Sequence, residues 1–488
     1  MSGSFNTVIQ LIYLAAASCF VLGLHLMNNP ATARRGNQVS VAGMVAAIGA
    51  TGALVIHQGL IDTTGWIVIA AGIGVGGGLG LYTARTVKMT AMPQLVSIFN
   101  AVGGGAAALV AISDYMELTT AKPFHLATIS YAKLAAGTAV HIPAATSVTT
   151  LLDVIIGAVT FSGSIIAAGK LQGVITSAPV SFPGARIVNL LLAAAAVGVG
   201  AYVIASPTMI GLGIVIAAAL IFGVSMVMPI GGADMPVVIS LLNAFTGTAV
   251  AMAGFVINNT ALIIAGALVG ASGGILTKLM ADAMNRSIPN IMLGGFGSGD
   301  AVAAVAATGG AGVQSIAADD AAIQLAYASK VVIVPGYGLA AAQAQHEVAA
   351  LADLLESRGV DVSYAIHPVA GRMPGHMNVL LAEANVPYPL LKEMDEINPE
   401  FSRTDVALVI GANDVTNPAA RRPGTAISGM PILDVDAAKS IIVIKRSMGH
   451  GYAGIDNELY TNPKTSMFFA DAKKGLAELT ASVKTLVG

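Results

Sequence analysis

The fold is decided by the stretch VVIVPGYGLAA at residues 331–341. Four β-branched residues stop at Pro335 and Gly336, and an Ala- and Gln-rich segment that favours a helix follows. A strand, a tight glycine turn and a helix in that order begin a dinucleotide-binding βαβ unit. In such a unit Gly336 permits the turn, Gly338 lets the backbone approach a pyrophosphate, and Ala341 keeps the helix close to the strand. The helix N-terminus then offers N–H groups to the phosphates.

The glycine pattern alone is weak evidence, because the chain contains it twice more. One copy, at residues 72–77, lies inside an apolar helical run, and another, at residues 449–454, precedes no helix. Only the copy at Gly336 has a strand before it and a helix after it. The flanks therefore favour a nucleotide site there over a plain strand-to-helix turn.

The charged residues are distributed unevenly. The chain has 488 residues, of which 55% are hydrophobic and only 10% charged, whereas soluble domains carry about 25% charged residues. Residues 1–286 contain 16 charged residues and residues 287–488 contain 34. We expect a transmembrane domain over residues 1–286, a linker and the start of the soluble domain over 287–329, and a Rossmann-like domain over 330–488. The net charge of −2 gives no indication of nucleic-acid binding.

Nine apolar runs are long enough to cross a bilayer as helices, which takes about 20 residues. They cover approximately residues 5–27, 39–57, 64–84, 92–112, 147–169, 184–205, 208–228, 236–257 and 260–281. An odd number places the two termini on opposite sides of the membrane. The single cysteine, Cys19, lies in the first run and is interpreted as a core residue.

The basic residues between the runs indicate the orientation. The pairs that fall on one side are Arg34 with Arg35, Arg85 with Lys88, Lys170 with Arg186, and Lys278 with Arg286. That side is predicted to be the cytoplasm, so the N-terminus is outside and the C-terminal domain is cytoplasmic. The loop 113–146 has two lysines but also acidic residues and histidines, and we interpret it as a surface loop.

Small and polar residues mark several of the spans. Gly266, Gly270 and Gly274 recur every four positions, and glycines are dense from residue 72 to 80, as in helices whose backbones approach closely. Asn100 and Asn243 lie within spans, and Asp234 lies at the end of one. These polar residues either join helices or hold water. No span carries the dense chain of acids and histidines expected of a self-sufficient proton pump, so any protons are expected to cross by water and a few polar groups.

Strands alternate with helices after residue 330. The predicted strands are 331–334, 361–366, 406–410 and 441–445, and the predicted helices are 339–357, 376–384 and 434–438. This order predicts a doubly wound parallel sheet, which binds ligands beyond the carboxyl ends of its strands. The candidate cofactor-binding residues at those ends are Gly336, Tyr337, Gly338, Ala341, His367, Val369, Ala370, Gly371, Arg372, Gly411, Asn413, Asp414, Lys445, Arg446, Ser447, Gly451, Tyr452 and Ala453.

The strand ends favour NADP over NAD. An NAD site usually has an acid at the end of the second strand to bind the ribose 2′-hydroxyl, but His367 stands there. A 2′-phosphate requires cations, and Lys445, Arg446 and Ser447 supply two charges and a hydroxyl. Asp414 is the one acid among these ends, and Tyr452 between glycines suits a mobile lid. No catalytic triad or metal motif is present, and hydride transfer needs none because the cofactor carries the chemistry.

These motifs resemble the beta subunit family of proton-translocating NAD(P) transhydrogenases over nearly the whole chain. The matching motifs are GGADMPV at 231–237, VPGYG at 334–338, HPVAGRMPGHMN at 367–378, MDEIN at 394–398, IGAND at 410–414 and KRSM at 445–448.

The resemblance implies a Re/Si-specific enzyme whose soluble domain binds NADP(H) inverted from the usual Rossmann orientation. It implies that Gly336, Tyr337 and Gly338 lie at the pyrophosphate, that Arg372 lies near the phosphates, and that Lys445 to Ser447 hold the 2′-phosphate. It places Tyr452 in a lid loop and Asp414 near the nucleotide.

The resemblance also implies partners and a proton path. One or more alpha chains bind NAD(H), hydride passes from NADH there to NADP⁺ here, and protons flow inward. The complex is expected to be a dimer of heteromers in the bacterial inner membrane. Asn243 and Asp234 belong to the proton path or its gate. Asn100 stands where some members have a histidine and others have one on the partner, so we expect the missing titratable group on the alpha side.

Two other classes of protein share some of these features. A transporter or channel with an NADP-sensing cytoplasmic domain would need a selectivity element or charged midplane sites, and a membrane-tethered NADP-dependent quinone reductase would need ligands for a second redox cofactor. The sequence predicts neither feature.

Overall fold

The computed structural model describes residues 2–27, 30–59, 61–87, 91–120, 144–176, 180, 184–231, 234–284, 287–292, 312–371, 375–423, 425, 427–449, 451, 453 and 455–487. The chain divides into two compact units. The first consists mainly of residues before 278, and the second consists mainly of residues 295–488 with the short segments 231–237 and 278–291. Each unit is described by itself.

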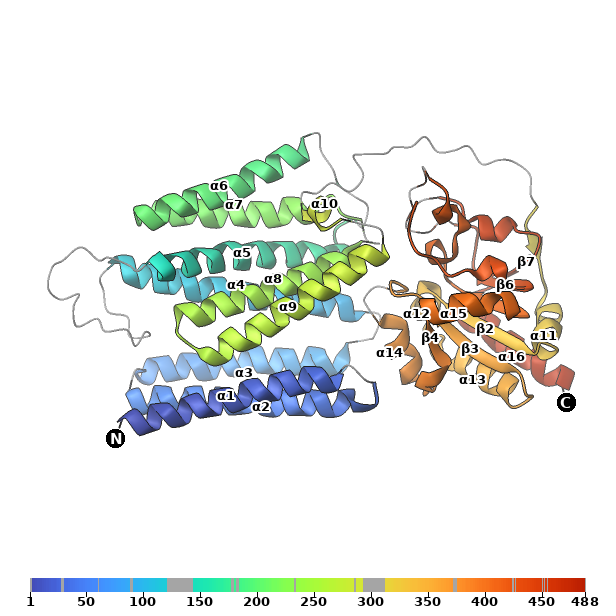
Figure 1. The fold of residues 1–488 in the computed structure, drawn as a ribbon, viewed down its shortest axis with the longest axis horizontal. Coiled ribbons are helices and arrows are strands. Elements are labelled where there is room, and N and C mark those ends of the chain that lie inside the picture. Colours follow the sequence, from blue (N-terminus) through green and yellow to red (C-terminus); the bar gives the residue numbers. More distant parts are fainter. Residues whose placement is uncertain are drawn as a thin grey trace. The chain divides into compact units, whose positions relative to one another are not determined.

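Nine helices of the described chain are long and apolar enough to cross a membrane, which confirms the nine predicted spans. They lie alongside one another in Figure 1. Their bounds are α1 Ser2–Met27, α2 Pro30–Gln58, α3 Thr63–Thr86, α4 Met92–Thr120, α5 Ala144–Gln172, α6 Ala185–Ala205, α7 Met209–Val227, α8 Met235–Val256 and α9 Thr260–Ala283. A short helix, α10 Ile288–Met292, follows them.

Small residues allow some of these helices to approach closely. A Cβ at Gly266 of α9 would lie 2.4 Å from the backbone nitrogen of Ala251 in α8, and a Cβ at Gly157 of α5 would lie 2.5 Å from the carbonyl oxygen of Gly104 in α4. The close approach predicted for α9 is therefore present at Gly266. It is absent at Gly274 and along the glycine-rich stretch of α3, where an added Cβ would meet no described atom within 4 Å.

Lys170 connects two helices of the first unit. Its side chain lies near the end of α5 and is fully buried. Its ammonium group donates to the carbonyl oxygens of Met228 at 2.5 Å and of Ile230 at 2.8 Å, directly after α7 ends. These carbonyls lack partners within their own helix, and a cation at a helix C-terminus is stabilised by the helix dipole. Lys170 is therefore part of α5 and not, as predicted from the sequence, a charge between two spans.

The second unit contains a seven-stranded parallel sheet in the order β1-β7-β6-β5-β2-β3-β4. The strands are β1 Gln314–Ser315, β2 Lys330–Pro335, β3 Asp361–Ile366, β4 Leu391–Glu393, β5 Val406–Ile410, β6 Ser440–Lys445 and β7 Thr465–Phe469. The doubly wound parallel sheet and its four predicted strands are confirmed. β1, β4 and β7 were not predicted. The strand order reverses between β2 and β5, which is where such sheets bind ligands.

Helices and 3₁₀ turns cover the sheet. The helices are α11 Ala318–Ala326, α12 Tyr337–Ala342, α13 Gln345–Glu356, α14 His376–Glu383, α15 Met394–Ile397 and α16 Ala472–Val487. The 3₁₀ turns are η3 Tyr388–Leu390, η4 Asn398–Arg403, η5 Asp414–Thr416, η6 Pro418–Arg421, η7 Val435–Ala437 and η8 Glu458–Thr461.

Two helix predictions were inaccurate. The single helix predicted over 339–357 is two helices, because Gln343 adopts a left-handed conformation with φ of 51° and ends α12. The helix predicted over 434–438 is only the three-residue turn η7.

The core of this unit is the central sheet. Residues 331–334 of β2, 406–410 of β5 and 441–444 of β6 are buried almost completely, as in a parallel sheet that is covered on both faces. One face packs against irregular segments through Phe401, Leu433 and Tyr460. Because these strands need no solvent-facing residue, they are continuous apolar runs of Val, Ile and Leu, with one alanine at 407.

Two glycine segments cross where β2 and β5 end. Gly336 donates its N–H to the carbonyl of Ile410, and Gly338 donates to the carbonyl of Gly411, both at 2.9 Å. A Cβ at Gly336 would lie 2.4 Å from the backbone of Ala412, and one at Gly338 would lie 2.6 Å from the Cα of Gly411. The crossing therefore excludes side chains at these glycines.

Substitution of Gly411 tests this crossing. Gly411 has φ of +65°, and a Cβ there would lie 2.3 Å from the Cα of Gly338. We expect Gly411→Ala to lower the free energy needed to open β2 and β5 locally by about 3 kcal/mol. The loss arises because alanine is strained in the left-handed conformation and because its Cβ clashes with Gly338. Amide hydrogen exchange of peptides covering β2 and β5 in the purified chain measures this.

The control is Gly359→Ala. Gly359 has φ of +85° and open space around it, so only the conformational cost of about 1 kcal/mol applies. Equal effects of the two substitutions would show that the close crossing does not contribute to stability.

Candidate functional site

A cavity lies at the carboxyl ends of β2, β3, β5 and β6, where the sequence placed the ligand. The residues predicted to bind a cofactor that line it are Gly336, Tyr337, Gly338, Ala341, Val369, Ala370, Gly371, Gly411, Asn413, Asp414, Lys445, Arg446, Ser447, Gly451 and Ala453. Four strand ends that are far apart in the sequence thus converge on one space. Arg372 and Tyr452, which were also predicted, lie outside the described residues.

His367 is near this cavity but does not line it. It directly follows β3 and is 1% exposed. Its Nε2 lies 2.9 Å from the carbonyl oxygen of Pro431, and its Nδ1 accepts from the N–H of Val369 at 3.2 Å. A neutral ring that donates from Nε2 satisfies both contacts. Burial lowers the pKa of His367 to about 4, which maintains this neutral form at physiological pH.

The glycine turn has a structural requirement in addition to the predicted one. The N–H of Gly338 is hydrogen-bonded to Gly411, and the helix that follows, α12, has only six residues. The sequence alone predicts a glycine at 338 so that a pyrophosphate can approach the backbone. The structure shows that the crossing with Gly411 already requires a glycine at this position.

Asp414 contacts Gly451 and Ala453, which also line the cavity. One of its carboxylate oxygens accepts from the N–H of Ala453 at 3.0 Å. A Cβ at Gly451 would lie 2.4 Å from the other carboxylate oxygen, so the backbone passes directly against the acid. Asp414 begins the turn η5 just beyond β5. The acid thus joins the ends of two strands across the site.

Lys445 provides a partly desolvated cation. Its ammonium group lies 4.5 Å from the centre of the Tyr460 ring and donates to the carbonyl of Gly449 at 2.5 Å. Burial lowers the pKa of Lys445, while the carboxylates of Asp414 and Asp456 act in the opposite direction. A cation in such surroundings gains more from an anionic ligand than one in bulk water does. Arg446 and Ser447 beside it are exposed.

The family model described as NAD(P) transhydrogenase beta subunit matches residues 9–482 of the chain. This chain belongs to that family. Two relatives named NAD(P) transhydrogenase subunit beta, one from Rhodospirillum rubrum and one from a designated strain of that species, are each 48% identical to it over 464 residues. The alignment covers 95% of this chain and 96% of each relative.

Family membership establishes the broad function. A transhydrogenase beta subunit takes part in an oxidoreductase that uses NAD(H) and NADP(H), and its designation implies an alpha partner. The nine apolar helices make this a multi-pass membrane protein. A match over residues 9–482 favours this reading over a transporter or a quinone reductase.

Several residues that line the cavity were not predicted. Val415, Ile427 and Met430 come from the irregular connection between β5 and β6, and Asp471 follows β7. Asp471 could have been predicted only by recognising β7, the strand that precedes it. The sequence of β7, TSMFF, mixes polar and apolar residues, unlike the apolar sequences of the central strands. Because β7 was not predicted, the presence of a fifth strand end at the site was not predicted either.

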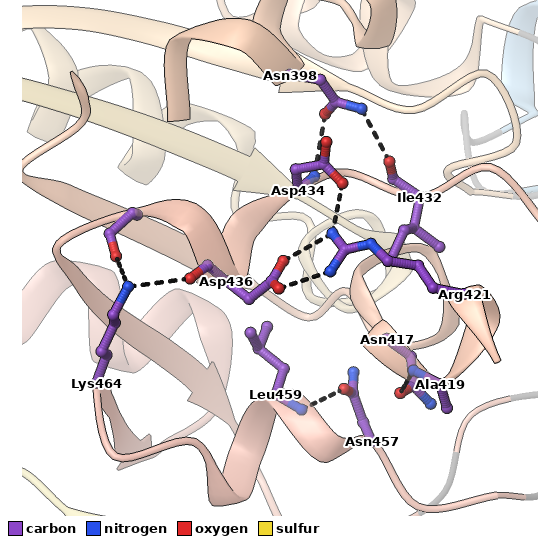
Figure 2. Close-up of polar contacts among 11 residues, drawn as sticks. Asn398, Asn417, Ala419, Arg421, Ile432, Asp434, Asp436, Asn457, Leu459 and Lys464 are labelled. Carbon is purple, nitrogen blue, oxygen red and sulfur yellow. Dashed lines mark hydrogen bonds and ion pairs between the residues drawn. The ribbon is translucent and has the colours of Figure 1, made fainter. Parts of the chain in front are cut away.

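A polar network positions the irregular connection (Figure 2). Arg421 forms ion pairs with Asp434 at 2.5 Å and with Asp436 at 2.6 Å. Asn398 donates to the carbonyl of Ile432 at 3.0 Å and accepts from the N–H of Asp434. These contacts fix both ends of the segment that carries Ile427 and Met430, so a long loop presents apolar side chains to the cavity.

The polar residues predicted in the membrane occupy different surroundings. Asn100 of α4 is 4% exposed, and its side-chain nitrogen lies 3.4 Å from the carbonyl of Ile239 in α8. Asn243 is half-buried on α8, one turn beyond Ile239. Asp234 lies in the turn before α8, where its carbonyl accepts from the N–H of Val237. Asn100 and Asn243 therefore lie near the α4–α8 contact.

The buried His367 predicts a pH dependence of stability. Its folded pKa of about 4 lies below the ordinary 6.5, so the unfolded chain takes up the proton first as the pH falls. We expect the second unit to lose about 3 kcal/mol between pH 6.5 and pH 4 from this group. Hydrogen exchange of the peptide around Pro431, measured across this pH range, detects the loss.

Two variants test whether His367 causes this pH dependence of stability. His367→Gln keeps a donor and cannot titrate, so the part of the pH slope due to His367 should disappear. His346→Gln removes an exposed histidine and should leave the slope unchanged. An unchanged slope in His367→Gln would contradict the assignment.

Proposed function

We propose that this chain binds NADP(H) in the cavity and that the alpha partner binds NAD(H). In the complex, hydride passes directly from NADH to NADP⁺ with Re/Si specificity and produces NADPH while protons move inward. The observation that supports the nucleotide assignment is the cluster of Lys445, Arg446 and Ser447 at the end of β6, beside the glycine turn. The end of β3 has a buried neutral histidine instead of an acid for a free ribose 2′-hydroxyl.

The residues present fit a phosphorylated dinucleotide. Lys445 is partly desolvated, and Arg446 and Ser447 add a second charge and a hydroxyl for the three oxygens of a 2′-phosphate. Asn413 lines the cavity, and its side-chain oxygen is buried with no hydrogen-bond partner within the described residues. It offers an acceptor to a ribose hydroxyl or a carboxamide. Gly371, with φ of +103°, lets the end of β3 bend around the same space.

The chemistry of hydride transfer belongs to the nicotinamide ring when NADP⁺ is bound. The chain positions that ring, holds the phosphate end and excludes water. Asp414 has a different role, because it is the acid that holds Ala453 and acts electrostatically on Lys445. We propose that occupancy of the site is transmitted through Asp414 to the segment around residue 451. We assign Arg372 to the phosphates and Tyr452 to the lid.

The proposed setting is the bacterial inner membrane, with the N-terminus outside and the second unit in the cytoplasm. Arg35, Arg85, Arg186 and Lys278 support this orientation, because their places near the ends of α2, α3, α6 and α9 put them on one side of alternating spans. We propose a dimer of heteromers, with Asn100, Asn243 and Asp234 in the proton path or its gate.

Removal of the cations tests the NADP assignment. Lys445→Ala and Arg446→Ala should each weaken NADPH binding about 10- to 100-fold, the value of one or two charge-assisted hydrogen bonds. NADH lacks the 2′-phosphate, so its weaker binding should not change. Calorimetric titration of both nucleotides on the purified chain measures the difference.

Lys439→Ala is the matched control. Lys439 is an exposed lysine that pairs with Asp405 at the opposite ends of the strands, and its removal should leave both affinities unchanged. A parallel loss of NADPH and NADH affinity in the Lys445 and Arg446 variants would refute the 2′-phosphate assignment. So would wild-type binding of NADH as tight as that of NADPH.

Separation of the subunits tests the proposal that this chain binds NADP(H) and the alpha partner binds NAD(H). The chain alone should bind NADPH but should not reduce NADP⁺ with NADH, because the hydride donor site is on the partner. Addition of the alpha partner should restore transfer and, in sealed vesicles, proton movement. Full proton-coupled turnover by this chain alone would contradict the proposal.

A further inference from the structure

A carboxylate that has no role in the predictions from sequence is buried inside a membrane helix. Asp153 of α5 is 0% exposed, and neither of its side-chain oxygens has a hydrogen-bond partner within the described part of the chain. Its neighbours Leu151 and Val154 belong to an apolar cluster with Tyr115 and Leu212. An ionised carboxylate in such surroundings is costly, and a protonated one is tolerated. Ionisable residues at such depth commonly mark proton relays.

Asp153 belongs to a row of buried polar residues. Ser147, Thr150, Asp153, Thr160 and Ser164 are spaced by three, four or seven residues, so they share one face of α5. None of them is more than 6% exposed. The hydroxyl of Ser164 also has no hydrogen-bond partner among the described residues. Thr150 and Thr160 donate to carbonyl oxygens within α5, whereas the side chains of Asp153 and Ser164 have no partner among the described residues.

Buried polar residues of α4 extend this row toward the C-terminal end of α5. Gln94, Ser97 and Asn100 are buried and three residues apart on α4. The two helices are antiparallel, because a Cβ at Gly104 would lie 2.7 Å from Thr160 while Gln94 donates to the carbonyl of Leu171 at 3.2 Å. The polar groups therefore follow the α4–α5 contact from Ser147 to Leu171.

Few other titratable groups face Asp153. On α4, Asp114 and Tyr115 lie toward the same end, and Tyr115 packs in the cluster beside Leu151 and Val154. Helices α7 and α8 carry no titratable side chain, and on α6 Tyr202 is 60% exposed. Lys170 is at the opposite end of α5 and bonds to carbonyls. Within these described helices, Asp153 is the acid placed deepest in the polar row.

We infer that Asp153 is a proton-carrying group of this transhydrogenase subunit, an inference that rests on the proposed proton coupling. Its carboxyl O–H bond breaks as the proton passes to a water molecule on the Thr160 side. The carboxylate then takes a proton from a water molecule on the Ser147 side, which the proposed orientation places outside. This assigns a protonatable group to this chain, whereas the resemblance led us to expect one on the alpha partner in place of a histidine at Asn100.

The test uses the complex of both subunits in sealed vesicles. Proton uptake is followed with an enclosed pH-sensitive dye, and hydride transfer from NADH to NADP⁺ is followed by absorbance in the same sample. Asp153→Asn keeps the size but cannot carry a proton, and it should lower the number of protons moved per hydride about a hundredfold. Asp153→Glu keeps the carboxyl and should restore most of the coupling. Asp282→Asn removes an exposed acid paired with Lys278 and should change nothing.

Infrared spectroscopy provides a readout that a purely structural role would not affect. The wild-type complex should show a carboxylic acid C=O band that is absent in Asp153→Asn and shifted in Asp153→Glu. If the Asn variant does not assemble, the comparison of wild type with Asp153→Glu still decides whether the band belongs to this residue. A band unaffected by the Glu substitution overturns the inference.

The outcomes separate this inference from the proposed function. Unchanged coupling in Asp153→Asn would overturn the role of Asp153 and leave the proposed function intact. A wild-type complex that transfers hydride without moving protons would refute the coupling itself. Loss of coupling with rescue by Glu supports the inference.

Discussion

Two backbones meet at the end of the sheet with no room for a side chain between them. Gly336 and Gly338 after β2 contact Gly411 and Ala412 after β5 and form two hydrogen bonds there. Since the strand order reverses between β2 and β5, this contact lies where a doubly wound sheet opens to its ligand. The cavity depends on this contact. After β2 and β5 the chain turns away in opposite directions, and the space between the two turns stays open.

The central strands were predictable because they are buried on both faces. Residues 331–334, 406–410 and 441–444 are runs of branched apolar residues with no alternation, and little else in the second unit has this pattern. The edge strands were missed for a physical reason. β1 has two residues and β4 has three, so their pairing with a neighbour, rather than their own sequence, makes them strands. The break of the predicted helix at Gln343 depends on a left-handed residue that helix propensity does not reveal.

The positions of the candidate site residues were more predictable than their contacts. A residue that follows a strand end reaches the edge of the sheet, so the glycines, Asp414 and Lys445 could be placed from the order of the strands. His367 follows the same rule, yet its ring turns inward to the carbonyl of Pro431, 64 residues away. No local pattern encodes a contact that distant. The network around Arg421 is unpredictable for the same reason, since its partners lie on an irregular connection.

The membrane unit places its polar groups between helices instead of on a single conspicuous span. Each of its helices is apolar enough to insert, so composition predicted the spans but not their neighbours. Only the packing shows that Asn100 reaches α8 and that Ser164 is buried. Isolated serines and threonines in a span have little meaning until the helix face that they share is known.

The ammonium group of Lys170 has a mechanical consequence. Two hydrogen bonds to the carbonyls of Met228 and Ile230 join the end of α5 to the end of α7. A lengthwise slip of one helix past the other would separate a buried cation from both of these carbonyls, which is costly. The pair is therefore locked in register, and any adjustment to a thinner or thicker bilayer must be a tilt of both helices together.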